Sequence, residues 1–526
     1  MTRRNTSSPR FNRCGALILL LLLRETACLA SSSSAPPSTY DANIPSSATI
    51  RVVSVNKNGG GIQVYDFSDE KNAIGDVDDG HNSKRRQIWN PHATWMSIQG
   101  QVASALRSTF LPTGFPSRTP PGYLKYSVWS WIQDVSTQLR SVLATQRILE
   151  GVGVGREGAT ALSALFNYLV RDGFGMAATL LFTYAASSRF RSDCKRWRIF
   201  ADMSVDIGIT LEVAATLLPS AFFLPMICLG NVFKAMCGVA AGACGGSINL
   251  HWANGSDISD INAKFGAQHT VTAALGLVFA GVFAQSVNRV SSRNLWTLYF
   301  FLTFIHIFAN LRCMRLISFD YLNTIRMDMV LDKFFDNNGN INSTTILSPQ
   351  LISQNEPLWF LLPTIKRLLC RPSPPNCRIH LGVSFNEFSR LVTVGKAEGR
   401  EESLINGVNV TSSTAKDGYL ISVGNNSGKH LTSDIVVCFL SNITPIQETK
   451  AYFHAKLLCR RLSDVGQCDS NKEIDEIVVQ EISKETEQNL ETDWSDFTTL
   501  CKNAGWDLSR SELDTQGYEI QVVETL

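Results

Sequence analysis

Two carboxylates lie one helical turn apart within an apolar segment of the chain. Asp202 and Asp206 occupy the predicted helix from Trp197 to Leu218, and their spacing places them on one face of that helix. A pair of this kind can bind a cation or exchange protons, and its burial in a membrane-type helix is costly, which marks it as a candidate site. The alternative is an ion pair with a basic residue. The candidates for that role are Arg198, Lys234 and Lys264.

A second set of polar residues follows farther along the chain. Asp260, Lys264 and Gln268 recur at every fourth position and therefore form one stripe on the predicted helix from Ile258 to Val287. His251 precedes them within an apolar stretch. Because no second histidine or cysteine lies at ligand spacing, a hydrogen-bonded seam between helices is favoured over a metal site. The sequence predicts no metal.

A glycine-rich motif at residues 153–158 matches the G-x-G-x-x-G pattern of dinucleotide-binding folds. In those folds a strand precedes the motif, whereas residues 139–150 have helical spacing here. A tight turn between two helices is the better interpretation. The chain also lacks a Walker A motif, a G-x-S-x-G elbow and an H-E-x-x-H motif. The sequence therefore predicts no cofactor and points to no reaction class.

Four long stretches without a charged residue characterise the middle of the chain. They comprise residues 213–233, 235–256, 265–288 and 294–311. Each is close to the run of roughly 20 apolar residues that crosses a bilayer as a helix. Five glycines between Met226 and Asn249 are typical of closely packed membrane helices. We therefore expect a membrane-embedded helical domain, and the alternative is a large soluble helical core.

Prolines set several of the expected helix ends. Pro219 and Pro225 are expected to break the chain at an apolar corner, and four prolines between Leu111 and Tyr123 predict an extended arm. The last helix of the domain is expected from Arg293 to Arg326, with aromatic residues near its start as an interfacial anchor.

The balance of charge argues against nucleic acid as a partner. Lysine and arginine number 48 and aspartate and glutamate 46, which gives a net charge of +2. A surface for nucleic acid needs an excess of basic residues that displaces counterions from phosphates. None of the 13 cysteines forms a C-x-x-C pair, so neither a zinc ribbon nor a thioredoxin-type centre is indicated.

The two ends of the chain differ from its middle. Residues 1–30 combine basic residues, a short apolar run and a small-residue end, which is the pattern of a secretory signal. The Pro- and Ser-rich stretch that follows is either a plastid-type transit sequence or a linker. Strands are expected at Ile50 to Val55 and Ile62 to Phe67. Near the C-terminus, strands are expected at residues 378–388, 418–424, 435–440 and 518–523, and helices at 446–462 and 494–504.

The fold class is therefore predicted as mainly α, with a multi-helix membrane-type domain and a small C-terminal α+β domain. The expected organisation is a targeting segment at 1–30, a region of low order at 31–94 and a helical domain at 95–330. A linker at 331–375 and a C-terminal α+β domain at 376–526, with an acidic insert at 471–493, complete the chain.

Several short motifs resemble those of the Root UVB Sensitive family. The similarity spans roughly Gly114 to Trp506. Its most specific elements are Ala144-Thr145-Gln146, Gly151-Val152-Gly153-Val154-Gly155, Asp172-Gly173-Phe174-Gly175-Met176, Lys195-Arg196-Trp197-Arg198 and Glu356-Pro357-Leu358. The chain departs from the family at Cys244 to Ser247, at Phe265 and at His269, which alters the charge of that stretch. The resemblance implies plastid association and links to ultraviolet-B responses, development, auxin transport and vitamin B6 status, but it carries no catalytic residues.

These observations favour a non-enzymatic membrane protein that binds or moves a small polar solute or scaffolds partners. The alternatives are a membrane-surface enzyme of unknown reaction and a soluble helical protein that docks on membranes. The expected partners are membrane lipid, a second protein of the family and an unidentified small molecule, and the expected location is a membrane of the endomembrane system or the plastid. The residues expected to line a polar interior are Gln146, Asp202, Asp206, Lys234, His251, Asp260, Lys264 and Gln268.

Overall fold

The computed structural model forms two compact units, Met1–Ser104 and Ala105–Leu526, which are considered separately. It describes residues 50–55, 62–67, 91–153, 161–287, 292–336, 348–359, 377–393, 417–425, 433–468 and 476–520. The expected targeting segment and most of the glycine-rich motif lie outside the described residues. In the first unit, β1 (Ile50–Val55) pairs antiparallel with β2 (Ile62–Phe67), and both strands match the prediction. Helix α2 (Pro91–Phe110) follows them in the chain.

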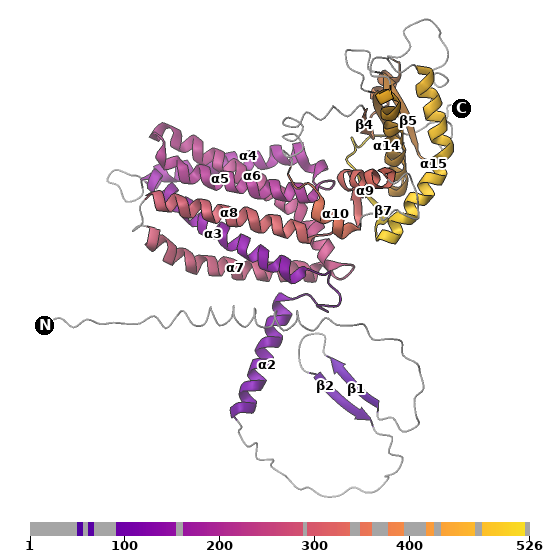
Figure 1. Ribbon diagram of the computed structural model, residues 1–526. Coiled ribbons are helices and arrows are strands. Elements are labelled where there is room, and N and C mark those ends of the chain that lie inside the picture. The colour runs from indigo at the N-terminus through magenta and orange to yellow at the C-terminus, as the bar shows by residue number, and fades with distance from the viewer. Residues whose placement is uncertain are drawn as a thin grey trace, which may run out of the picture. The chain divides into compact units, whose positions relative to one another are not determined.

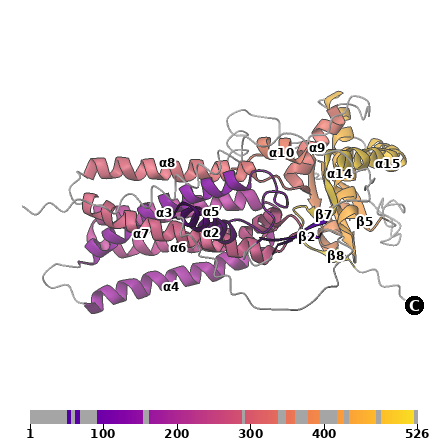
Figure 2. The same cartoon turned by 90° about the horizontal axis from the view of Figure 1, so that it is seen from below.

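Six long helices lie side by side and make up the first part of the second unit (Figures 1 and 2). They are α3 (Tyr123–Val152), α4 (Ala161–Ala186), α5 (Cys194–Ala214), α6 (Ser220–Ala253), α7 (Ile258–Val287) and α8 (Ser292–Leu316). The short 3-10 turns η1 (Ser187–Arg189) and η2 (Ala215–Leu217) flank α5. The chain is thus mainly helical, as predicted.

Helices α5 and α6 approach each other closely at a pair of glycines. A Cβ atom added at Gly208 would lie 2.6 Å from the carbonyl oxygen of Gly230, and one added at Gly230 would lie 2.8 Å from that of Gly208. Only glycine fits at both positions, which bears out the expected role of Gly230. The other four glycines of this prediction, by contrast, have open space around the Cβ position and make no close helix contact there: Gly238, Gly242, Gly245 and Gly246.

Two predicted helix ends are wrong. Pro225 does not break the chain, because it lies in the second turn of α6, which runs without interruption from Ser220 after Pro219. A proline near a helix start removes few intrahelical hydrogen bonds and is tolerated there. The helix predicted from Arg293 to Arg326 ends at Leu316 instead. Its last ten residues form an extended segment, β3 and the start of α9, whose packing overrides the local preference.

Two helices of the described part of the chain are long and apolar enough to cross a membrane. They are Ser220–Ala253 and Arg293–Leu316, which correspond to α6 and α8. The sequence alone predicts four such stretches.

The C-terminal part of the second unit combines a small sheet with packed helices. Strand β6 (Ser433–Leu440) pairs parallel with β4 (Cys377–Leu381) and β8 (Glu519–Ile520), and antiparallel with β5 (Tyr419–Asn425). A short parallel pair joins β3 (Tyr321–Asn323) to β7 (Asp507–Glu512). The helices are α9 (Thr324–Asp336), α10 (Pro349–Asn355), α12 (Phe385–Thr393), α14 (Pro445–Cys468) and α15 (Glu476–Ala504).

Local predictions in this part hold for most elements. The strands at 418–424 and 435–440 and the helix at 446–462 correspond to β5, β6 and α14. The strand predicted at 378–388 ends at Leu381, because Gly382 adopts a positive φ of 61° and a helix begins at Phe385. The helix predicted at 494–504 begins as early as Glu476, so most of the acidic segment belongs to α15.

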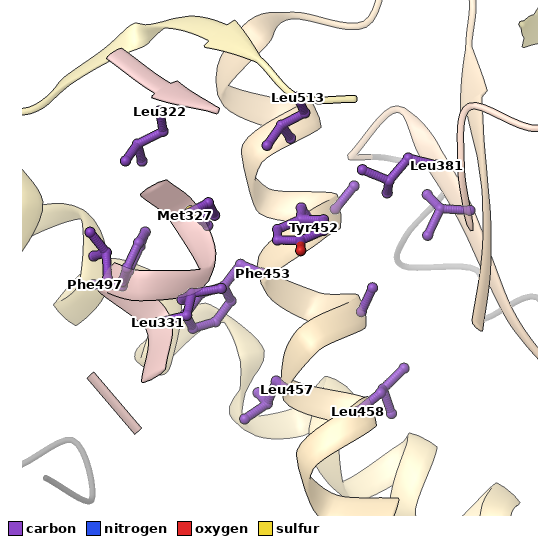
Figure 3. Packing of buried hydrophobic residues seen from close by; sticks show 14 of the residues in the cluster. Leu322, Met327, Leu331, Leu381, Tyr452, Phe453, Leu457, Leu458, Phe497 and Leu513 are labelled. Atoms are coloured by element: carbon purple, nitrogen blue, oxygen red, sulfur yellow. The ribbon is translucent and has the colours of Figure 1, made fainter. Parts of the chain in front are cut away.

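One apolar core holds this part together and includes residues that precede it in the chain. Met327 and Leu331 of α9 pack with Phe453 of α14 and Phe497 of α15 (Figure 3). Leu322 of β3 belongs to the same cluster. The segment after α8 is therefore bound into the C-terminal core by apolar contacts as well as by the β3–β7 pair.

The buried histidine of this core predicts a pH dependence of stability. His454 is 2% exposed, and its Nδ1 lies 3.2 Å from the Tyr419 hydroxyl. Burial, with a further contribution from Lys450, lowers the pKa of His454 to about 4. Between its ordinary pKa near 6.5 and that value, the unfolded chain binds a proton that the folded chain excludes. The His454 contribution to the free energy of unfolding should therefore fall by about 2 kcal/mol from pH 7 to pH 5.

The measurement is denaturant unfolding of the full chain in detergent at both pH values, followed by tryptophan fluorescence. His454→Gln should lose this part of the pH dependence, whereas His380→Asn, at a half-buried position, should retain it. An identical pH dependence in wild type and His454→Gln would contradict the assignment.

Candidate functional site

Helix α5 carries a row of buried charged side chains. Lys195, Asp202, Asp206 and Glu212 are each at most 5% exposed. With a rise of 1.5 Å per residue, the row extends over about 26 Å from Lys195 to Glu212, close to the roughly 30 Å of a bilayer core. An uncompensated charge in such surroundings is very costly, so each member must have a partner on another element.

Asp206 binds two cationic or protonatable side chains from different helices. Its carboxylate accepts a hydrogen bond from Nη1 of Arg140 on α3, a residue with no exposed surface. Its Oδ2 lies 3.0 Å from Nδ1 of His306 on α8, which is 1% exposed. The Thr210 hydroxyl donates to the Asp206 carbonyl oxygen at 2.6 Å. Asp206 therefore connects α3, α5 and α8 in one buried cluster.

Asp202 has a separate set of partners one turn earlier. Gln133 Nε2 of α3 donates to Oδ2 at 2.6 Å. Nη1 of Arg198 donates to Oδ1 within α5 itself. The Arg198 side chain is 21% exposed, whereas that of Asp202 is 6% exposed. The pair thus extends from the interior to an accessible surface.

Glu212 completes the row at the other end of α5. Its Oε1 lies 2.5 Å from Nζ of Lys234 on α6 and 4.0 Å from Nε of Arg171 on α4. Of the three basic residues considered as partners for the two aspartates, only Arg198 has that role in the described interactions. Lys234 pairs with Glu212, and Lys264 pairs with Asp260 at 3.3 Å.

A cleft of about 230 Å³ lies beside the Arg198–Asp202 pair. Side chains of α3, α5, α6 and α7 line it, so four helices contribute to one concave site. Asp134 Oδ2 and His269 Nδ1, 3.2 Å apart, belong to the lining. The complete lining comprises Tyr126, Ser130, Trp131, Asp134, Arg198, Ala241, Gly245, Ile248, Asn249, Phe265, Gln268 and His269.

Gln268 is the sequence-predicted residue that lines this cleft. It is 3% exposed, its Oε1 accepts a hydrogen bond from Trp131 Nε1 at 3.2 Å, and its Nε2 donates to the Phe110 carbonyl oxygen at 2.7 Å. Gln268 therefore fixes the Trp131 ring and ties α7 to α3. This contact fits the predicted seam between helices.

The other predicted residues lie in separate contacts. Asp260 accepts a hydrogen bond from the Thr113 backbone N–H at 2.7 Å, beside a second, open cavity of about 710 Å³. His251 makes an edge-to-face contact with Trp252, with ring centroids 4.8 Å apart. Gln146 Nε2 donates to Glu150 Oε1 at 3.1 Å within α3. In the described interactions, none of Lys234, His251 and Lys264 bonds to either aspartate of α5, so the eight residues do not form one network.

Sequence reasoning missed the residues that neutralise the aspartates. These residues lie about 70 to 100 positions away from the aspartates in the chain. Gln133 and Arg140 belong to α3, which carries several charged residues, whereas His306 lies near the middle of the apolar helix α8. A polar residue at the middle of a long apolar helix is a signal in its own right. Applied to α8, that rule would have found His306, whereas Arg140 is one of several charged residues of α3 and does not stand out there.

A fourth buried cluster joins the start of α5 to the segment before the C-terminal sheet. Lys195 Nζ lies 3.0 Å from Glu356 Oε2 and donates to Ser353 Oγ at 2.8 Å. Arg326 Nη2 donates to Glu356 Oε1 at 3.2 Å. Burial alone would raise the pKa of Glu356, but Arg326 and Lys195 hold it below its ordinary value. The carboxylate is therefore ionised at neutral pH and clamps both cations.

The described charged side chains are of two kinds, those buried between helices and those that reach the cleft. No group of three or more metal-type ligands occurs among the residues described. The buried aspartates are neutralised by fixed partners, whereas Arg198, Asp134 and His269 reach an accessible cleft. A small polar molecule can bind there through charge and hydrogen bonds.

Comparison with known proteins identifies the family. Residues 97–338 match the model of the "Vitamin B6 photo-protection and homoeostasis domain", and residues 345–521 match that of the "Root UVB sensitive protein, C-terminal". No solved structure matches the chain.

Three relatives show how far the similarity extends. Protein root UVB sensitive 3 of Arabidopsis thaliana is 31% identical over 353 residues, 66% of this chain and 74% of the relative. RUS family member 1 of Dictyostelium discoideum is 32% identical over 53% of this chain and 51% of its own length. Protein root UVB sensitive 2, chloroplastic, of Arabidopsis thaliana is 30% identical over 45% of this chain and 54% of its own length. The chain thus spans about half the length of these last two relatives. The chain belongs to the Root UVB Sensitive family.

Proposed function

We propose that the helical part of this protein is embedded in a membrane and binds a small polar solute in the cleft beside Arg198 and Asp202. The carrying observation is the distribution of polarity across the helices. Charged side chains of α5 are buried, whereas large apolar side chains on the outer helices are exposed. A soluble protein normally has the reverse arrangement.

The exposed apolar side chains gather on three helices. On α4, Leu162, Leu180 and Tyr184 are 75%, 73% and 91% exposed. On α7, Leu277 is 71% exposed, and on α8, Phe304 is 66% exposed. Monomeric soluble proteins rarely expose contiguous apolar patches of more than a few hundred Å². Lipid is the occupant that suits this surface, because α8, one of these three helices, meets the criteria for a membrane span, and so does α6 of the same helical part.

The buried row of α5 supports a role in solute binding. Ionisable groups within membrane domains are costly and typically mark paths or sites for polar substrates. Here the row passes from Lys195 to Glu212, and only the Arg198–Asp202 pair adjoins the cleft. We assign the cleft as the solute site and the Asp206 cluster as the rigid support beneath it.

The family supplies the biological setting of the proposal. The matched domain carries vitamin B6 homoeostasis in its name, and one relative is described as chloroplastic. We therefore propose a contribution to vitamin B6 homoeostasis and to the ultraviolet-B response from a membrane of the plastid or the endomembrane system. A second protein of the family is the proposed protein partner.

Membrane integration is tested by alkaline carbonate extraction of cells that express the full chain. The chain should remain with the membrane pellet. Replacing Leu180 and Leu181 of α4, both about 70% exposed, by serine should lower the retained fraction, because lipid-facing hydroxyls are costly. The matched control is Leu351→Ser on α10, also exposed but outside the six helices. A wild-type chain that stays monomeric and dispersed without detergent would overturn the proposal.

The importance of the buried cluster is tested with Asp206→Asn. Asparagine keeps the shape and can still accept a hydrogen bond from Arg140, but it leaves that buried guanidinium without a counter-charge, so the loss of stability should be about 3–5 kcal/mol. Function should fall because the charge that holds Arg140 and His306 in place is gone. The measurement is complementation of a line that lacks this protein, with the abundance of the folded chain read in parallel. Asp257→Asn, at an exposed position, is the control, and full complementation by Asp206→Asn would contradict the role.

A further inference from the structure

The guanidinium group of Arg198 has a free edge at the cleft. In the described interactions its Nη1 donates to Asp202, while Nη2 and Nε have no hydrogen-bond partner. The side chain lines the cleft and is 21% exposed. Arginine binds phosphate and carboxylate through two parallel N–H groups, and an edge held by Asp202 on the other side is already oriented for this.

The carboxylate of Asp134 also has a free oxygen. Both of its described side-chain contacts, with His269 at 3.2 Å and with the Thr272 hydroxyl at 3.3 Å, involve Oδ2. Oδ1 has no partner among the described hydrogen bonds, and the side chain is 27% exposed. A carboxylate in this position accepts a hydrogen bond from a protonated ring nitrogen, as in proteins that bind a pyridinium group.

Aromatic rings form further parts of the lining. Tyr126, Trp131 and Phe265 contribute from α3 and α7, and the Tyr126 and Phe265 rings lie 5.9 Å apart at 67°. Trp131 is fixed by its hydrogen bond to Gln268. Rings held in this way offer flat apolar surfaces to a planar ligand.

The volume of the cleft and the chemistry of its lining narrow the choice of ligand further. A volume of about 230 Å³ admits a single-ring molecule and is below the size of typical pockets for larger ligands. The lining contains no lysine, so the site holds its ligand without a Schiff base. One free cationic edge and one free carboxylate oxygen together match a ligand that carries both signs of charge.

We propose that the cleft binds a planar heteroaromatic zwitterion, a ring with a protonated nitrogen and a phosphate or carboxylate substituent. The acidic group binds Arg198, the ring nitrogen binds Asp134, and the ring lies against the aromatic lining. This assignment rests on the proposed function, since it specifies the solute of the same cleft.

The test uses pyridoxine 5′-phosphate, which has such a ring, a phosphate and no aldehyde to react with surface lysines. Binding to the purified full chain in lipid nanodiscs is measured by calorimetry. Pyridoxine and inorganic phosphate should each bind at least about tenfold more weakly, because each lacks one half of the recognition. Phenyl phosphate, which has no ring nitrogen, separates the contribution of Asp134. Nicotinate tests whether a carboxylate replaces the phosphate.

Variants assign the binding to the cleft. Arg198→Gln combined with Asp202→Asn removes the cation without leaving a buried carboxylate unpaired, and it should raise Kd by about tenfold or more. Asp134→Asn should abolish the preference for pyridoxine 5′-phosphate over phenyl phosphate. Arg118→Gln, in the separate cavity of about 710 Å³, should leave Kd unchanged.

Several outcomes would overturn the assignment and can be told apart from failure of the proposed function. Equal binding of pyridoxine 5′-phosphate and inorganic phosphate would show a plain anion site. An equal effect of Arg118→Gln and the double variant would place the binding elsewhere. If carbonate does not extract the chain and the chain binds neither pyridoxine 5′-phosphate nor nicotinate, the proposed ligand class is rejected and the membrane proposal stands. Release by carbonate would instead reject the membrane proposal, whatever binds.

Discussion

Pairing of the buried charges on α5 is the constraint on which the rest of the helical part depends. Four side chains of one helix are buried, and each is neutralised from a different direction. Asp206 requires Arg140 and His306, and Glu212 requires Lys234. Asp202 pairs with Arg198 of α5 itself, and Lys195 pairs with Glu356 after α10. Because leaving one such charge unpaired costs about 3–5 kcal/mol, the pairs fix the register of α3, α6 and α8 against α5. Close contact of Gly208 and Gly230 then becomes possible.

The polarity of the outer surface follows from the same arrangement. Helices that direct their few charged groups inward present apolar side chains outward, as Leu180 of α4 and Phe304 of α8 do. In water this distribution raises the free energy of the folded state twice, since it buries charge and exposes hydrocarbon. In lipid only the first cost remains, and pairing offsets it. The membrane proposal therefore explains two features with one environment.

The sequence predicts local features better than it predicts which distant side chains form ion pairs. Asp202 and Asp206 are found because two carboxylates in an apolar helix break a simple pattern, and the strand Tyr419–Asn425 follows from alternation. Arg140 is missed because the side chain it neutralises lies 66 residues away, and no periodicity within α3 reveals the pairing. Pro225 is misjudged because proline is treated as a helix breaker, although it lies near the start of α6, where few intrahelical hydrogen bonds are lost. The cleft cannot be predicted from local patterns either, because its lining comes from four helices that only the folded structure brings together.

The first turn of α5 connects the cleft to the C-terminal part of the chain. Lys195 and Arg198 are three residues apart, and the Lys195 ammonium group is clamped by Glu356 while the Arg198 guanidinium borders the cleft. Glu356 also binds Arg326 of α9, whose neighbours Met327 and Leu331 belong to the C-terminal core. A helical turn moves as a rigid unit, so a displacement of Arg198 cannot leave the Lys195–Glu356–Arg326 cluster undisturbed. The C-terminal core and the proposed solute site are therefore mechanically joined through one turn of helix, and the presence of both in the matched family models is physically consistent with that connection.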